Sequence, residues 1–199
     1  NNTNFIISIS HTTRKPRLNE INGKDYFFVS SEEFEDLIKK NNFFEHANIF
    51  DNRYGTSKKP VLELLSLDKD VLFDIDWQGS RKIKKKLGKE VVSIFILPPS
   101  KKELIKRLKK RAQDPDHIVK QRLSFYKMEL SHWKEYKYVL INRNLNETVK
   151  KIKVIIEAER YKNFIPVKDL TKQNTKIIYE AERIALQKKN LILKKIRSL

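Results

Sequence analysis

The amino-acid sequence predicts an α/β domain with a mainly parallel core sheet. Apolar segments of strand type alternate with segments of helical periodicity over most of the chain. Residues 91–100, VVSIFILPPS, are apolar almost without interruption, which is typical of a strand covered on both faces. Residues 70–76, DVLFDID, form a second apolar strand that ends in two carboxylates. Open α/β sheets bind their ligands at this end of the strands.

Local patterns give the order of the elements. Strands are expected at residues 5–10, 26–29, 43–50, 70–76, 91–100 and 136–142. A loop rich in turn-forming residues follows the first strand, and residues 51–57 are expected to turn. Helices are expected from Ser30 or Ser31 onward and at residues 59–67, 78–88, 101–111, 115–135 and 145–161.

Three of these helices have a recognisable start. Ser30 or Ser31 can form a capping box with Glu33 or Glu32. The helix at residues 59–67 is entered through Pro60, whose missing N–H has no partner in a first turn anyway. Ser100 is expected to cap the basic helix that follows the apolar strand.

The composition restricts the possible partners and compartments. The formal net charge is +18, which attracts polyanions, but lysines occur in nearly every segment, and this scatter favours composition over a nucleic-acid function. The chain has no cysteine, which excludes disulfides and fits a reducing, cytoplasmic compartment. No apolar run approaches the roughly 20 residues of a membrane helix, and no secretory signal opens the chain.

Side chains suited to a phosphate follow the first strand. Arg14 and Arg17 lie on either side of Pro16, and the planar fork of arginine matches phosphate oxygens. Tyr26 and Tyr54 could donate hydroxyl groups to the same phosphate. Each of these residues also has an ordinary interpretation, as surface charge or as half-buried packing.

Carboxylates form a second group of candidates. Glu45 could accept two hydrogen bonds from the edge of a base, although an exposed strand residue would give the same pattern. Asp74 and Asp76 end an apolar strand, where two charges need a partner or a ligand. The histidines lack metal-ligand spacing and are interpreted as non-ligands; they are His11, His46, His117 and His132.

The chain resembles the guanylate kinases in the order and spacing of several segments. These are SISHTTRKPR, GKDYFFVSSEEF, FFEHANIFDNRYGTS, VLFDIDWQG, IFILPPS, the pair KRL…R and QRL, and YVLIN. The resemblance runs from about Ser8 to Tyr161. It implies the fold of a P-loop nucleoside monophosphate kinase, with a parallel core sheet, a GMP-binding subdomain and a helical lid. It also implies ATP-dependent phosphorylation of GMP to GDP, assisted by Mg²⁺.

The resemblance further implies the roles of individual residues. Those implied to hold the phosphate of GMP are Arg14, Arg17, Tyr26 and Tyr54, and those implied to contact guanine are Ser10, Glu45, Thr56 and Asp74. On the ATP side, Asp76 is implied to face magnesium and the triphosphate, and Asn142 to lie near the ATP base. The residues implied to neutralise the transferred phosphoryl group are Arg107, Arg111 and Arg122.

The sequence departs from the family pattern in three ways. Ala112 follows the lid arginine where the family has glycine, and Arg143 follows the asparagine where it has an acidic residue. The P-loop motif, G-x-x-x-x-G-K-[ST], does not occur in the sequence. Asn1 is no initiator, since Met128 is the only methionine. We therefore expect that the first strand and P-loop preceded Asn1, and that this chain alone does not catalyse.

The expected organisation is a guanylate kinase-like domain at residues 1–162 and a basic helical extension at residues 163–199. The GMP-binding subdomain is expected at about 17–73 and the lid at about 107–125. Two other functions stay open: a non-catalytic module that binds phosphorylated partners in the GMP groove, and a charge-driven nucleic-acid-binding protein. An intact set of guanine-reading carboxylates disfavours the first, and the lack of an aromatic-studded binding motif disfavours the second.

Overall fold

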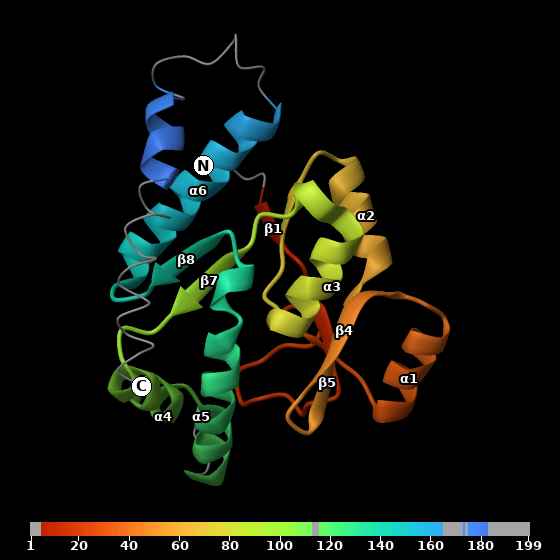
Figure 1. Ribbon diagram of the computed structural model, residues 1–199. Coiled ribbons are helices and arrows are strands. Elements are labelled where there is room, and N and C mark those ends of the chain that lie inside the picture. The colour runs from red at the N-terminus through yellow and green to blue at the C-terminus, as the bar shows by residue number, and fades with distance from the viewer. Residues whose placement is uncertain (1–4, 113–115, 165–172, 174, 183–199) are drawn as a thin grey trace. The chain divides into compact units, whose positions relative to one another are not determined.

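The computed structural model describes residues 5–112, 116–164, 173 and 175–182 (Figure 1). The chain divides into two compact units, Asn1–Val91 and Val92–Leu199. Each unit combines helices with a parallel strand pair, so the α/β class expected from the sequence is confirmed. Within the described residues, no helix is both long enough and apolar enough to cross a membrane.

The first unit contains two sheets. In one, β1 (Phe5–Ile7) pairs in parallel with β6 (Asp70–Leu72). The other has the strand order β3-β2-β5-β4 and comprises β2 (Ser10–Thr12), β3 (Phe27–Phe28), β4 (Phe43–Ile49) and β5 (Asn52–Ser57). The helices of this unit are α1 (Ser31–Lys39), α2 (Lys58–Ser66), α3 (Trp77–Leu87) and the short 3₁₀ helix η1 (Gly88–Glu90).

The strand β5 is the main departure from the sequence-based expectation. Its residues were expected to turn, but they pair antiparallel with β2 on one side and with β4 on the other. The turn itself is only Phe50 and Asp51, and Phe50 adopts a φ of 55°. Pairing on both edges of β5 overrides a polar composition that by itself indicates a loop.

Two of the expected strands differ from the structure in ways that concern the candidate site residues. The segment 5–10 divides into β1 and β2, which belong to different sheets. The strand expected at residues 70–76 ends at Leu72. Asp74 and Asp76 therefore lie in the connection between β6 and α3. Backbone pairing with β1 stops at Leu72. The side chains beyond it therefore need not point alternately to the two faces of a sheet, as they would in a strand.

The capping box expected at the start of α1 is confirmed. Ser30 Oγ accepts a hydrogen bond from the Glu33 N–H at 3.1 Å, and Glu33 Oε2 accepts one from the Ser30 N–H at 2.7 Å. The helix packs through Phe34, which is fully buried, against Phe43 of β4. Gly55 of β5 permits this contact, since a Cβ there would lie 2.9 Å from the Phe43 ring and 3.1 Å from the Phe34 ring.

Helix α3 covers strand β4 along its backbone. Lys86 Nζ donates to the Phe44 carbonyl, Lys82 Nζ to the His46 carbonyl, and Gln78 Nε2 to the Asn48 carbonyl at 3.4 Å. Four helical residues rise about 6 Å and two strand residues about 6.6 Å, so donors on successive turns match every second carbonyl. Because β4 is the last strand of its sheet, these side chains satisfy groups that would otherwise form an open edge.

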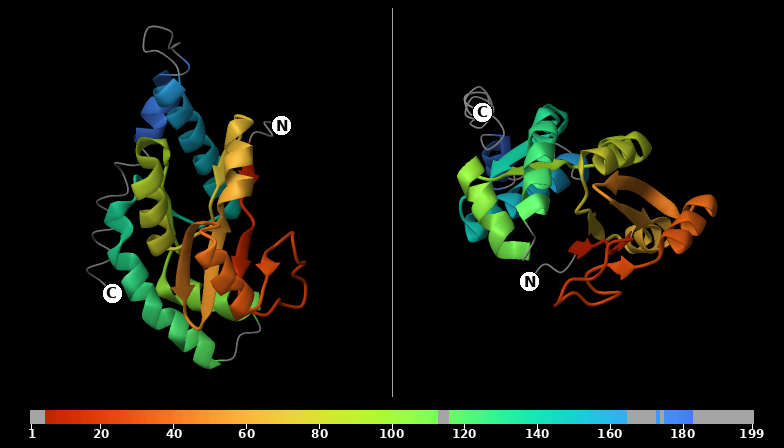
Figure 2. Two further views of the ribbon diagram at one scale, coloured as in Figure 1. Left: turned by 90° about the vertical axis from the view of Figure 1, so that its right-hand side faces the viewer. Right: turned by 90° about the horizontal axis from the view of Figure 1, so that it is seen from below.

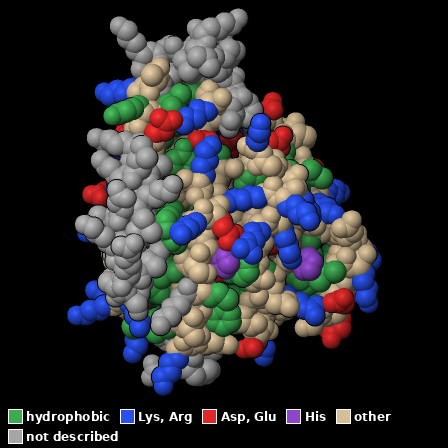
Figure 3. Space-filling view, in the orientation of Figure 1, with side chains coloured by type: hydrophobic (Ala, Val, Ile, Leu, Met, Phe, Trp, Pro, Cys, Tyr) green, Lys and Arg blue, Asp and Glu red, His purple; other side chains and the backbone are tan. Residues whose placement is uncertain are grey.

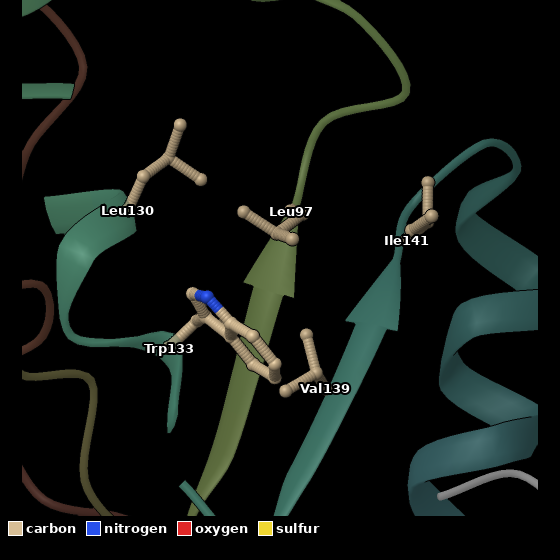
Figure 4. Close-up of a cluster of buried hydrophobic side chains, with 5 residues drawn as sticks. All are labelled: Leu97, Leu130, Trp133, Val139 and Ile141. Carbon is tan, nitrogen blue, oxygen red and sulfur yellow. The ribbon is translucent and has the colours of Figure 1, made fainter. Parts of the chain in front are cut away.

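In the second unit, β7 (Ile94–Leu97) pairs in parallel with β8 (Tyr138–Ile141), and the helices are α4 (Lys101–Ala112), α5 (Asp116–Ser131), η2 (Trp133–Glu135) and α6 (Leu145–Phe164). Ser100 caps α4 as expected, since its Oγ accepts from the Glu103 N–H at 3.1 Å. One face of the strand pair packs against α5 and η2 (Figure 4). That cluster consists of Leu97, Leu130, Trp133, Val139 and Ile141.

The opposite face of β8 packs against α6 and part of the C-terminal segment. Residues 175–182 are helical, and Figure 2 shows this helix beside α6. Ala181 is fully buried, and Lys162 of α6 forms an ion pair with Glu182 at 2.8 Å. The buried residues of this cluster are Tyr138, Leu140, Ile155, Ala158 and Ala181. The described part of the extension is thus a helix that contributes to the core of the second unit.

We expect Ala181→Lys to destabilise the second unit by about 3 kcal/mol, because it overpacks the cluster and buries an unpaired charge. The matched control is Tyr179→Lys on the same helix, where the side chain is 67% exposed. The control should change the free energy of unfolding by less than about 0.5 kcal/mol. Urea unfolding of both variants measures the difference. Equal stability of the two would show that the helix contributes nothing to the core.

Candidate functional site

The residues implied to bind GMP all belong to the first unit, which can therefore be described as one site. Glu45 of β4 lies opposite Thr56 of β5, and Thr56 lies opposite Ser10 of β2. The Thr56 hydroxyl donates to Glu45 Oε1 at 2.8 Å, and its oxygen lies 3.3 Å from Ser10 Oγ. The sheet thereby aligns one carboxylate and two hydroxyl groups in a row across three strands.

Glu45 is the only carboxylate of this row, and it is buried. The residue as a whole is only 4% exposed. Burial raises the pKa of Glu45, and the nearby Asp76 carboxylate raises it further, while Thr56 and Lys82 act in the opposite direction. Glu45 also lines a cavity of about 140 Å³ together with His46, Lys82 and Lys86. A buried carboxylate with spare acceptor capacity is chemically suited to adjacent N–H donors.

The start of α3 approaches Glu45 closely. A Cβ at Gly79 would lie 2.7 Å from Glu45 Oε2, so no larger residue fits there without displacing the carboxylate. Asp76 is the N-cap of this helix: Oδ1 accepts from the Gly79 N–H at 2.9 Å, and Oδ2 accepts from Gln78 Nε2 at 3.0 Å. The cap fixes the position of the Asp76 charge relative to Glu45.

Asp74 is placed differently from Asp76. It is exposed, and it precedes the helix cap by two residues. Asp76, which the resemblance assigned to the magnesium side, is the aspartate whose charge acts on Glu45. The structure therefore associates Asp76 with the row of base-contacting candidates more directly than Asp74.

Arg14 and two tyrosines form the other end of the site. The Arg14 guanidinium lies over the Tyr26 ring at 5.4 Å from its centroid, and the Tyr26 and Tyr54 rings meet edge to face at 6.1 Å. Burial alone would lower the pKa of Arg14, but interactions with Glu20 and Tyr54 raise it, so the group is fully charged. Cation–π contact and hydrogen bonding together hold this guanidinium in one orientation.

The strand pair β2–β5 connects the two ends. Tyr54 lies opposite Thr12, two residues from the Thr56–Ser10 pair. Thr12 is fully buried, and its Oγ1 accepts from the Arg14 N–H at 3.1 Å. Two strand residues span about 6.6 Å. Hydroxyl and carboxylate groups at one end and cationic groups at the other therefore lie within reach of a single nucleotide.

Glu20 connects the two arginines. Its Oε1 accepts from Arg14 Nη2 at 2.8 Å and lies 3.4 Å from Arg17 Nη1, while Oε2 accepts from the Arg17 N–H at 2.8 Å. Burial alone would raise the pKa of Glu20, but the bonds from Arg14 and Arg17 outweigh burial and lower it. Sequence reasoning identified both arginines but not Glu20, whose position three residues after Arg17 was the available signal.

The other candidate residues belong to the second unit. Arg107 of α4 forms an ion pair with Glu103 at 2.9 Å, and Arg122 lies on α5. Arg111 also lies on α4, but its side chain is outside the described part of the structure. Asn142 directly follows β8, and its Oδ1 accepts from the Thr148 hydroxyl at 3.3 Å. It thus lies at the carboxyl end of a parallel strand, where the sequence placed it.

Comparison with known proteins agrees with these observations. The family described as guanylate kinase matches residues 1–159. A guanylate kinase of Rickettsia felis is 52% identical over 161 residues, which are 81% of this chain and 83% of that protein. One from Paramagnetospirillum magneticum is 47% identical over 78% of this chain and 73% of its own length.

The fold comparison gives the same result. The crystal structure of guanylate kinase from Anaplasma phagocytophilum superposes with a TM-score of 0.69 at 38% sequence identity, covering 80% of this chain and 78% of that one. Family match, sequence identity and fold thus coincide over the same part of the chain, and this chain belongs to the guanylate kinase family.

Proposed function

We propose that this protein binds GMP in its first unit and that the reaction it serves is the ATP-dependent phosphorylation of GMP to GDP. The observation that carries the proposal is the row Glu45–Thr56–Ser10, which shares strand β5 with Tyr54 of the tyrosine and arginine cluster. One end of this arrangement offers acceptors and the other offers cations. A purine monophosphate that presents N–H donors on its base matches both ends.

The base end accounts for a preference for guanine. Guanine presents N1–H and N2–H₂ as adjacent donors, and an ionised carboxylate such as Glu45 can accept from both. Adenine lacks this pair of donors, so it would leave the remaining acceptor capacity of a buried carboxylate unfilled. Such unpaired groups discriminate strongly between related ligands. The Thr56 hydroxyl, held by Glu45 and near Ser10, fixes the orientation of the carboxylate.

The phosphate end accounts for a monophosphate. Arg14 and Arg17 supply charged donors, and Tyr26 and Tyr54 supply hydroxyl groups. Holding the base and the phosphate at once restricts the acceptor oxygen to one position, which is the main requirement for phosphoryl transfer.

The phosphoryl donor side of the proposal rests on the second unit. Arg107, Arg111 and Arg122 would stabilise charge on the transferred group, and Asn142 would lie near the ATP base. Among the described residues, no group of three or more acidic or histidine side chains could hold a metal ion. A magnesium ion would instead be held through one or two carboxylates together with substrate phosphates. Asp74 is an exposed carboxylate that can serve this purpose, and the bound ion would neutralise phosphate charge.

The alternatives are less well supported by the site. A module that binds phosphorylated partners without reading a base has no use for a desolvated Glu45. A nucleic-acid-binding protein would gather its positive charge, yet on the face shown in Figure 3 the basic side chains are scattered among acidic and apolar ones.

We expect Glu45→Gln to weaken GMP binding about 100-fold, or roughly 2.7 kcal/mol, because the amide turns a donor toward the donors of guanine. Calorimetric titration of the full chain measures the dissociation constant. Glu63→Gln is the matched control, since Glu63 is an exposed acid on α2. Unchanged GMP affinity in a folded Glu45→Gln protein would contradict the assignment of the base site.

The two aspartates can be separated by their effect on pH dependence. Protonation of Glu45 removes an acceptor, so GMP affinity should fall as the pH drops through its raised pKa. Asp76→Asn keeps a helix cap, because asparagine caps equally well, but removes a charge that raises this pKa. We expect the midpoint of the affinity loss to move to lower pH in Asp76→Asn and to stay unchanged in Asp74→Asn. The reverse result would favour the assignment of Asp74 to guanine.

The chain as given should not transfer phosphoryl groups. Its sequence lacks the P-loop, whose backbone amides and lysine fix the β- and γ-phosphates. A coupled assay of ADP release should show no GMP-dependent turnover above background, whereas GMP binding persists. Adding an upstream strand and P-loop from a relative should restore turnover. A rate comparable to that of a complete family member without such an addition would refute this expectation.

A further inference from the structure

We infer that Glu20 is a positioning residue that holds Arg14 and Arg17 together as a single phosphate-binding unit. This inference rests on the proposed function, because it assigns a role at the phosphate end of the same site. Its basis is the convergence of two guanidinium groups and one backbone N–H on a single carboxylate.

The burial of these groups shows that the arrangement is built into the fold. The side chains of Arg14 and Glu20 are 15% and 16% exposed, and that of Arg17 is 28% exposed. Charged pairs at this depth are screened less by water than surface pairs, so they contribute more to local order. The loop that carries them has no strand or helix between Thr12 and Phe27 to fix its path.

Two adjacent guanidinium groups repel each other in the absence of a ligand. The repulsion between like charges is stronger in a partly buried site, where water screens them less than on the surface. The Glu20 carboxylate offsets this repulsion and keeps both groups in place. It also bonds the backbone of Arg17, and this contact fixes the loop as well as the side chain.

The carboxylate leaves donors for a phosphate. A guanidinium group carries five N–H donors. Arg14 uses one nitrogen for Glu20 at 2.8 Å and another for the Lys15 carbonyl at 2.7 Å, and its face lies on Tyr26. Nη1 and Nη2 each carry two N–H groups, and Nε carries one. Arg14 can therefore donate to Glu20 and to a phosphate at the same time.

Charge and position predict opposite effects when Glu20 is neutralised. By charge alone, removing an anion beside two arginines should strengthen the binding of a phosphate. By position, the arginines lose their fixed arrangement and the phosphate must order them, which weakens binding. We expect the second effect, because Glu20 makes three contacts within the loop, whereas its replacement removes only one charge.

The test compares GMP with guanosine, which has the base but no phosphate. In calorimetric titrations of the full chain, Glu20→Gln should raise the Kd of GMP about tenfold, or roughly 1.4 kcal/mol, and leave that of guanosine within about twofold. Glu20→Asp keeps the charge but shortens the reach, so it should weaken GMP binding as well. Glu63→Gln serves as the control for a change of charge. Tighter or unchanged GMP binding by Glu20→Gln would overturn the inference.

A second readout does not depend on nucleotide binding. In the free protein, the Nε–H signals of Arg14 and Arg17 should be resolved by NMR and become mobile in both Glu20 variants, while Tyr54 and the rest of the sheet keep their shifts. Arginine signals as rigid as in the unmodified protein would also overturn the inference. If the unmodified chain binds neither GMP nor guanosine, the proposed function fails, and the arginine signals still decide the role of Glu20.

Discussion

The burial of one carboxylate, that of Glu45, is the constraint on which the site depends. An ionised group withdrawn from water needs partners, and here the Thr56 hydroxyl and the charge of Lys82 provide them. These partners come from a neighbouring strand and a following helix, so the cost of burial is offset only when β4, β5 and α3 are assembled. Part of the acceptor capacity stays free, and a ligand with paired N–H donors completes it. The proposed recognition of a base would thus be a consequence of how the first unit folds.

Helix α3 contributes both to the stability of the sheet and to the environment of Glu45. Lys82 and Lys86 bond carbonyls of β4 and so close the edge of the sheet, while Gly79, one turn earlier, lets the backbone approach the carboxylate. Asp76 caps the helix and acts on the pKa of Glu45. A change at any of these positions would alter stability and recognition together. Measurements on the site therefore need controls that separate folding from binding, such as conservative replacements that keep a cap.

Local signals in the sequence allowed much of the fold to be predicted, but the pairing of strands distant in sequence could not be predicted from them. The capping box at Ser30 and the cap at Ser100 depend on neighbours in sequence, and both were confirmed. The strand β5 was missed because its polar residues become a strand only between two partners. The environments of Asp74 and Asp76 could not be distinguished, since both end an apolar segment and only tertiary structure shows where β6 stops. Glu20 was missed because its role depends on two other side chains.

The division of the residues between the units has a consequence for the chemistry. Every side chain proposed to read GMP lies in Asn1–Val91, whereas the arginines proposed to stabilise the transferred phosphoryl group lie in Val92–Leu199. The contacts that orient the GMP-reading groups, including the Glu45–Thr56 and Arg14–Glu20 bonds, are all internal to the first unit. In the proposed function, recognition of GMP therefore needs no group from the second unit to be preorganised, whereas phosphoryl transfer would draw on residues of both units. The proposed roles are thereby separated, because the first unit orders the groups that would bind GMP and the second carries the charges that would stabilise the transferred phosphoryl group.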